Sequence, residues 1–143
     1  MEAFVDSSVL VAALQGDDPR HKPSLAVVTA FSRSKVCTAA HSLAEVYATL
    51  TAYPGSRRLT CQMALFYLAD LRQKLTVVSL DEEETWKSIE ATAMLGLPSG
   101  VVYDGLIAAC ARKAAAKTIY TWNSKHFERL GPEIAKRVKE PSH

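Results

Sequence analysis

Short runs of apolar residues alternate along this chain with longer amphipathic stretches. Four of the short runs predict β-strands, because they are brief, apolar and bounded by polar or turn-forming residues. They lie at residues 3–5, 36–39, 76–80 and 118–122. The amphipathic stretches predict helices at residues 9–14, 22–34, 41–53, 58–73, 81–95 and 103–116.

The alternation of strands and helices predicts an α/β sandwich around a mainly parallel sheet. Ser7 or Ser8 is expected to cap the first helix. The segment from Gly131 to Val138 fits either a final edge strand or a helix. Turn clusters separate the elements, but no internal repeat and no linker rich in Gly, Ser or Pro interrupts them. We therefore expect a single domain over residues 1–143.

Composition narrows the function classes. The 143 residues are 48% apolar and 22% charged, which is typical of a globular domain and excludes a low-complexity chain. The net charge of +2 lacks the strong basic excess of a protein that coats DNA. The first residues resemble no signal peptide, and no apolar run is long enough to span a membrane, so we expect a cytoplasmic protein.

The cysteines indicate neither a zinc site nor a disulfide framework. Cys37, Cys61 and Cys110 are odd in number, lie far apart and form no C-x-x-C pair. The sequence predicts three buried thiols.

Three acidic residues are isolated within apolar stretches. Asp6 is the only charged residue between positions 3 and 16, Glu45 between 36 and 56, and Asp104 between 91 and 111. An unpaired carboxylate is costly to bury, so each needs a basic partner, a network of donors or a cation. Any one of them could serve only as a helix cap or a salt-bridge partner.

The positions of these acids favour a shared site. Asp6 follows the first predicted strand, at the sheet edge where open α/β sheets bind ligands. Glu45 and Asp104 fall early in predicted helices, and Asn123 follows the last predicted strand. An all-oxygen set of this kind suits a hard cation such as Mg²⁺ or Mn²⁺, which serves phosphodiester chemistry. No phosphate-binding glycine motif is present to indicate a bound nucleotide.

Four ordered segments resemble the motifs of PIN domains, and most closely those of VapC-type toxins. They are Phe4–Leu10, Leu43–Tyr47, Tyr103–Ala109 and Thr121–Phe127. The resemblance extends from Phe4 to about Val138 and implies an α/β/α sandwich.

The resemblance also implies a Mg²⁺- or Mn²⁺-dependent endoribonuclease. Asp6, Glu45 and Asp104 match the family's acidic metal-binding positions, and Ser8 matches a small polar residue that supports the first acid. The fourth position, commonly Asp, is Asn123 here, and an Asp that often precedes the motif's phenylalanine is His126. Both departures remove negative charge and weaken a second metal position.

The partners implied by the resemblance are an RNA substrate, a small antitoxin and a second copy of the chain in a homodimer. An arginine of the antitoxin could enter among the three acids, and an antitoxin helix could pack around Phe31 and Phe66. Tyr103 and Trp122 flank the expected site and could stack on bases or complete the core. His41 and His126 are expected on the surface or at caps.

Other functions receive less support. A haloacid-dehalogenase-type phosphatase needs a second Asp two residues after Asp6, where this chain has Ser8. A receiver domain needs its paired acids beside the first strand, whereas Asp17 and Asp18 follow a helix. A catalytically weak PIN-like module that binds RNA or protein remains open because of Asn123.

Overall fold

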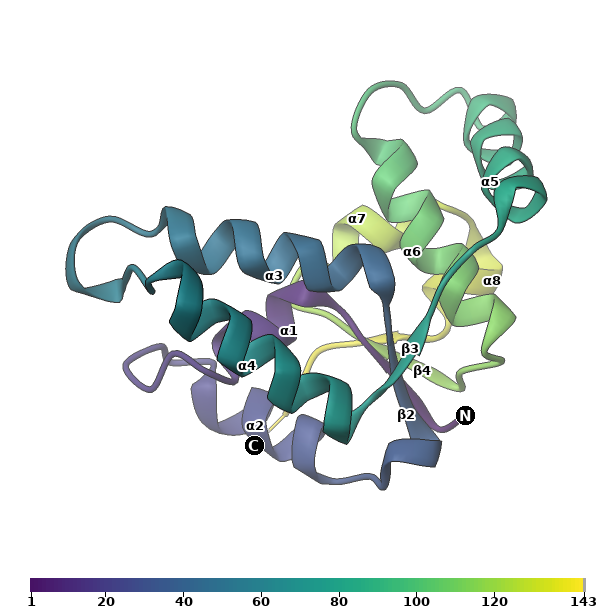
Figure 1. The fold of residues 1–143 in the computed structure, drawn as a ribbon. Helices are drawn as coiled ribbons and strands as arrows, with labels where there is room; N and C mark the ends of the chain where they lie inside the picture. The colour runs from purple at the N-terminus through teal and green to yellow at the C-terminus, as the bar shows by residue number, and fades with distance from the viewer. Residues whose placement is uncertain (143) are drawn as a thin grey trace.

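The computed structural model describes residues 1–142, and its centre is a five-stranded parallel sheet with helices on both faces (Figure 1). The strands run in the order β3-β2-β1-β4-β5, so the first strand lies in the middle. Their bounds are β1 Ala3–Val5, β2 Val36–Ala39, β3 Thr76–Val78, β4 Thr118–Tyr120 and β5 Val138–Lys139. The predicted α/β fold with a mainly parallel sheet is confirmed.

Helices fill the connections between the strands. The α-helices are α1 Ser7–Ala12, α2 His21–Thr29, α3 Ala40–Ala52, α4 Cys61–Lys74, α5 Glu82–Met94, α6 Val101–Lys113, α7 Ser124–Glu128 and α8 Pro132–Ala135. Two 3-10 turns lie at Arg33–Lys35 and Gly55–Arg57. In the part of the chain that the structure describes, no helix has the length and apolar character needed to cross a membrane.

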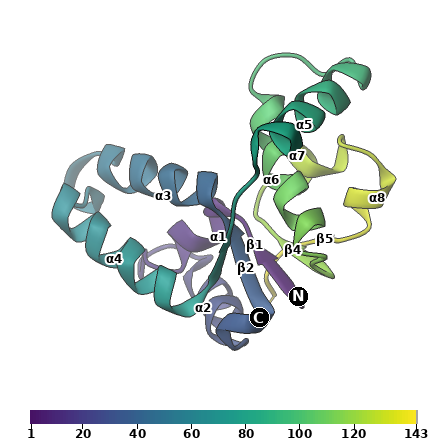
Figure 2. The ribbon, with the colours of Figure 1, turned by 45° about the vertical axis from the view of Figure 1, so that its right-hand side comes forward.

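The strands carry two cores because successive side chains point to opposite faces. Ala3 and Val5 of β1 pack with α1, α2, α3 and α4 on one face. Phe4 points the other way and packs with α6, α7 and α8. On that side of the sheet α5 lies against α6 (Figure 2). The result is an α/β/α sandwich with a helical layer on each side of the sheet.

The predicted ends of two strands were wrong, because the pairing with the neighbouring strand determines where each strand ends. β3 ends at Val78, two residues early, because its partner residue Ala39 is the last of β2. β4 ends at Tyr120, opposite Val5 at the end of β1. The undecided segment 131–138 contains both candidates, the short helix α8 and the first residue of β5.

Other differences are local. The helix predicted at 22–34 ends at Thr29, whose hydroxyl donates to the Leu25 carbonyl oxygen. Asp6, and neither Ser7 nor Ser8, occupies the position before α1. Cys37 and Cys110 are buried, but the expectation of a buried Cys61 was wrong, because this residue opens α4 on the exposed surface.

A close helix contact fixes α6 over the sheet. Gly105 faces α5 so tightly that a Cβ atom there would lie 2.7 Å from Thr92 Oγ1. Only glycine permits this approach without displacing α5. The contact therefore sets the position of the neighbouring residue Asp104.

Candidate active site

Asp6 lies where β1 ends, and its side chain is 3% exposed. Its Oδ2 atom accepts hydrogen bonds from Ser8 Oγ and Thr121 Oγ1, both at 2.8 Å. Each hydroxyl in turn accepts a backbone N–H, from Trp122 at 3.0 Å and from Asn123 at 3.0 Å. Asp6 is therefore held by a network of donors that orients the carboxylate.

The sequence indicated a role for one of these two hydroxyls and not for the other. Ser8 was expected to support Asp6, and it contacts that carboxylate. Thr121 was not assigned a role by the sequence reasoning. The only sign of its role in the sequence is that Thr121 directly follows a strand. It therefore lies at the sheet edge where the neighbouring strand ends before Asp6.

Glu45 lies in the second turn of α3 and reaches into the same edge. Its Oε1 atom is buried and has no hydrogen-bond partner among the described residues. The pKa of Glu45 is raised to about 7, chiefly by burial and then by the charges of Asp6 and Asp104, while the Ser7 hydroxyl opposes the shift. The charges of three carboxyl groups therefore act on one region, and among the described residues Glu45 is the one of the three with a buried oxygen that lacks a donor.

Asp104 lies in the first turn of α6, with its side chain 21% exposed. Burial raises its pKa, and the nearby charges of His126 and Arg129 oppose this effect. The Arg129 guanidinium lies 3.4 Å from Asp104 Oδ2, and His126 Nδ1 lies 3.9 Å from it. The sequence placed no basic residue near Asp104, and this arginine arrives from the turn after α7.

The hollow beside the acids has a volume of about 340 Å³. Glu45, Ser8 and Asn123 line it together with Arg20 from the loop before α2. Asn123 is exposed, and its side chain does not cap α7. Asn123 thus lines the hollow without a capping role, and its assignment as a fourth position stays a prediction.

These residues fit a divalent cation by their chemistry. All the ligand atoms that they offer are oxygens. Among the described residues one carboxylate oxygen is buried without a hydrogen-bond partner, and the acids repel one another. A cation would relieve both penalties. Within residues 1–142, however, no group of three or more His, Cys, Asp or Glu side chains is close enough to form a finished metal cage. The metal site remains a prediction.

The two aromatic candidates have different environments. Trp122 packs against the core, its indole N–H donates to Ser24 Oγ at 2.8 Å, and the Arg20 guanidinium lies 5.2 Å from its ring. These contacts support the structural interpretation of Trp122. Tyr103, by contrast, is 53% exposed.

The sequence matches the family model described as PIN domain over residues 3–131. Among curated proteins no match was found.

Solved structures share the fold at low sequence identity. The VapC20 toxin of Mycobacterium tuberculosis, described as cleaving the sarcin–ricin loop, is 20% identical with a TM-score of 0.70, covering 87% of this chain and 92% of that one. VapBC2 of Rickettsia felis, bound to a promoter DNA fragment, is 19% identical with a TM-score of 0.68 and 98% coverage of both chains. FitAcB of Neisseria gonorrhoeae is 17% identical with a TM-score of 0.67 and 99% coverage of both.

Proposed function

The chain belongs to the PIN-domain family, and on that premise we propose that it is a Mg²⁺- or Mn²⁺-dependent endoribonuclease that acts as the toxin of a toxin–antitoxin pair. The observation that carries the proposal is the buried Oε1 atom of Glu45, which has no hydrogen-bond partner within residues 1–142 and lies near the charges of two further acids. Natural proteins rarely leave a buried carboxylate oxygen unsatisfied without a functional reason. A bound cation supplies that reason.

The chain's own residues have separate roles in this proposal. Asp6, Glu45 and Asp104 would hold the ion, and Ser8 and Thr121 keep the Asp6 carboxylate in place. Arg129 favours the ionised form of Asp104, which a metal ligand requires. When bound, a divalent ion polarises a phosphoryl oxygen and lowers the pKa of water.

The fourth position is weak in this chain. Asn123 offers a neutral oxygen at the edge of the hollow, and His126 brings a ring nitrogen to Asp104 where related motifs often have a carboxylate. Fewer negative charges lower the affinity for a second cation. We therefore propose one well-held ion.

RNA is the proposed substrate. One structural neighbour is itself described as a toxin that cleaves the sarcin–ricin loop. Arg20 at the hollow and Arg129 beside Asp104 place positive charge where a phosphate backbone would pass. A catalytically weak binding module is the alternative that the departures at positions 123 and 126 keep open.

An antitoxin is the proposed protein partner, because several neighbours are toxin–antitoxin complexes. On α4 the side chains of Met63, Leu65 and Phe66 are 54%, 58% and 76% exposed, which leaves an apolar surface for a partner helix. Phe31 is half-buried against the core, so it contributes less than the sequence suggested. An arginine of the partner could pair with Glu45, and the toxin itself is proposed to form a homodimer.

The test is cleavage of a mixed RNA pool with Mg²⁺ or Mn²⁺, with and without EDTA. We expect cleavage only with the ion, and its loss in Asp6→Asn and Asp104→Asn proteins that remain folded. Expression alone should arrest growth, and co-expression of the antitoxin should relieve the arrest. Full activity in EDTA refutes metal dependence, and harmless expression of soluble, folded protein favours the binding module.

A further inference from the structure

Two aromatic rings stack across the edge of the sheet that carries the acids. The rings of His41 and Tyr103 have centroids 5.5 Å apart and planes only 8° from parallel. His41 belongs to α3 and Tyr103 to α6, which cover opposite faces of the sheet. The pair therefore bridges the two helical layers, and both side chains are exposed.

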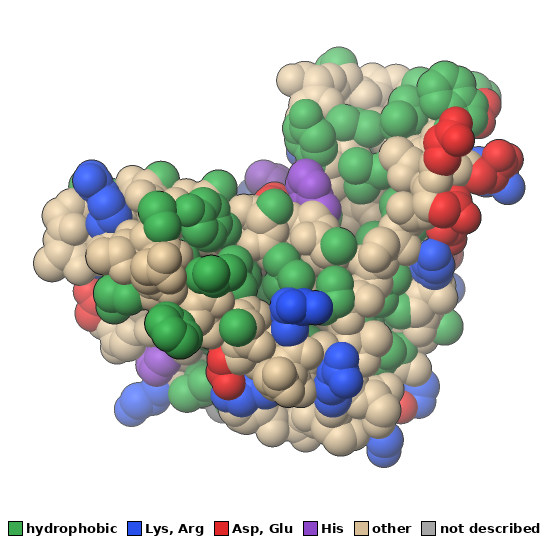
Figure 3. Space-filling view, viewed as in Figure 1, with side chains coloured by type: hydrophobic (Ala, Val, Ile, Leu, Met, Phe, Trp, Pro, Cys, Tyr) green, Lys and Arg blue, Asp and Glu red, His purple; other side chains and the backbone are tan. Residues whose placement is uncertain are grey.

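On each helix the aromatic residue is close in sequence to one of the acids. His41 precedes Glu45 by four residues, which places the two side chains on one face of α3. Tyr103 immediately precedes Asp104 on α6. In the space-filling view, histidine side chains lie in the hollow between the two raised parts of the molecule, next to acidic atoms (Figure 3).

A second hollow begins at one of these rings, that of His41. It has a volume of about 300 Å³, and its lining is mainly apolar, with a few polar groups. The lining residues that matter here are His41, Leu80, Thr85, Leu106 and Cys110. A mostly apolar hollow with a few polar groups is the usual form of a small-molecule site.

The two hollows follow one another along α3. Ala40 and His41 line the 300 Å³ hollow, whereas Glu45, Thr49 and Tyr53 line the 340 Å³ hollow. Glu45 lines the 340 Å³ hollow and follows His41, which lines the 300 Å³ hollow, by one helical turn. An extended strand lying along α3 would pass His41 and the 300 Å³ hollow first, and then Glu45 and the 340 Å³ hollow.

We propose that the His41–Tyr103 pair is a stacking platform for one nucleobase of the RNA, next to the phosphate held at the acids, with the edge of the base in the 300 Å³ hollow. The proposal rests on the proposed function. Single-stranded nucleic acids bind by stacking bases on exposed aromatic side chains, because every base has a π-face. Tyr103 meets that need, whereas Trp122 is occupied by Ser24 and Arg20.

A purely structural stack makes a different prediction. If the rings only tie α3 to α6, changing Tyr103 lowers the melting temperature without changing how strongly bases are bound. A platform instead links the ring to the base. The experiment therefore compares RNA that has bases with RNA that has none.

The test measures binding of fluorescent octaadenylate, and of an octamer of stable abasic spacers with the same backbone, in EDTA so that no cleavage occurs. The proteins are wild type, Tyr103→Leu, Tyr103→Phe and Trp86→Leu. Trp86 on α5 is a matched control, since it is 59% exposed and lies outside both linings. We expect Tyr103→Leu to weaken octaadenylate binding roughly tenfold and to leave the abasic octamer unaffected. Tyr103→Phe and Trp86→Leu should match the wild type.

Equal weakening for both octamers, or none for either, overturns the platform. Cleavage of the RNA pool by a Tyr103→Leu protein with wild-type affinity for octaadenylate overturns the platform and leaves the nuclease proposal intact. The expected base-dependent loss in a protein that cleaves no RNA supports the platform and rejects the nuclease. Absence of any RNA binding by the wild type in EDTA overturns the platform, and cleavage of the RNA pool with Mg²⁺ or Mn²⁺ tests the nuclease separately.

Discussion

Acidic side chains lie at both ends of the parallel sheet, but their pKa values are shifted in opposite directions. At the amino-terminal edge, Glu2 pairs with Lys117, and Glu133 pairs with Arg112 and Arg137. These contacts hold the pKa of Glu2 and of Glu133 below their usual range. At the carboxyl-terminal edge the pKa values of Glu45 and Asp104 are raised.

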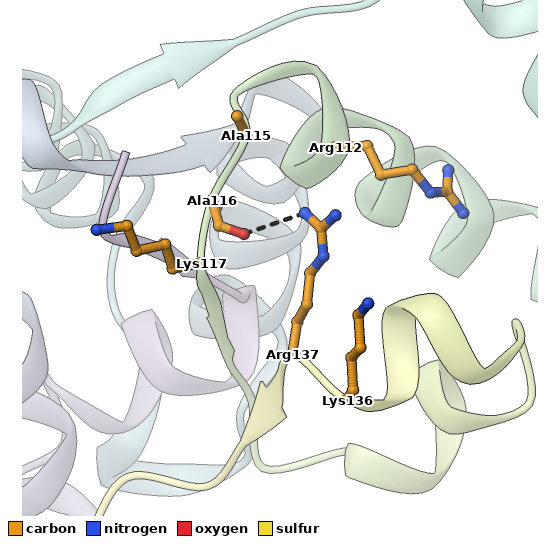
Figure 4. A pocket seen from close by; sticks show the side chains of 6 residues that line it. All are labelled: Arg112, Ala115, Ala116, Lys117, Lys136 and Arg137. Atoms are coloured by element: carbon orange, nitrogen blue, oxygen red, sulfur yellow. Dashed lines mark hydrogen bonds between the residues drawn. The ribbon is translucent and has the colours of Figure 1, made fainter.

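The size of a hollow does not reveal which edge is the site. The amino-terminal edge has a hollow of about 480 Å³ lined by Arg112, Lys117, Lys136 and Arg137 (Figure 4), larger than the 340 Å³ hollow beside the acids. Its charges are largely matched within the protein. The smaller hollow faces an unsatisfied carboxylate, and perturbed acids in a cleft are the better sign of function.

The largest expected difference between the edges is in catalysis. Glu45→Gln removes a charge from the acid cluster, and we expect RNA cleavage with Mg²⁺ to fall by several orders of magnitude. Glu133→Gln removes a charge from the amino-terminal edge and should leave the rate unchanged. Initial rates on the same RNA pool measure both effects. Equal rates for the two variants would show that the two edges do not differ in their role in catalysis.

The next difference concerns folding. Asp6→Ala deprives the Ser8 and Thr121 hydroxyls of their shared acceptor, and we expect a loss of about 2 kcal/mol in the free energy of unfolding. Glu133→Ala breaks only exposed ion pairs and should cost less than ~1 kcal/mol. Urea unfolding of both variants measures these losses. A loss at Glu133 equal to that at Asp6 contradicts the comparison.

The pH dependence of stability separates Glu45 from the paired acids. Its folded pKa of about 7 exceeds the ordinary 4.5, so between these values the folded chain binds more protons than the unfolded chain. Stability therefore falls as pH rises through that window and levels off above it.

Glu45→Gln should remove this fall. Without metal, we expect the variant to match the wild type near pH 4.5 and to be more stable at pH 8 by about 1–2 kcal/mol, since water still reaches part of the side chain. Urea unfolding across the pH range checks this. A variant that is less stable than the wild type at pH 8 would show that the ionised Glu45 carboxylate has favourable partners in the folded protein.

The smallest expected effect is at the fourth position. Asn123→Asp adds a charge beside the hollow, so the rise in melting temperature caused by Mn²⁺ should begin at several-fold lower ion concentration. Lys117→Gln, at the other edge, is the control and should leave that concentration unchanged. Identical Mn²⁺ profiles for wild type and Asn123→Asp would show that Asn123 does not face the ion.

The sequence predicted the fold well where elements are long and periodic, as in α3 or α6. It was less accurate where a partner decides the boundary: β3 stops at Val78 because β2 has already turned into α3. Asp6, Glu45 and Asp104 could be picked out because isolated charges are visible in a single chain.

Their surroundings could not be found in the same way. Thr121 and Arg129 reach the acids only through the fold, and one hydroxyl or one arginine in a sequence carries no sign of its partner. The stack of His41 on Tyr103 joins helices that are far apart in the chain. No local sequence pattern predicts such a contact.

The central claim is that the acids at the carboxyl-terminal edge, Asp6, Glu45 and Asp104, bind a divalent cation. Calorimetric titration of Mn²⁺ at pH 8 into wild type, Glu45→Gln and Glu133→Gln tests it most directly. We expect one ion to bind to the wild type and to Glu133→Gln with equal affinity, and at least about tenfold weaker binding to Glu45→Gln. Equal affinity in Glu45→Gln, or no binding to the wild type, would contradict the claim.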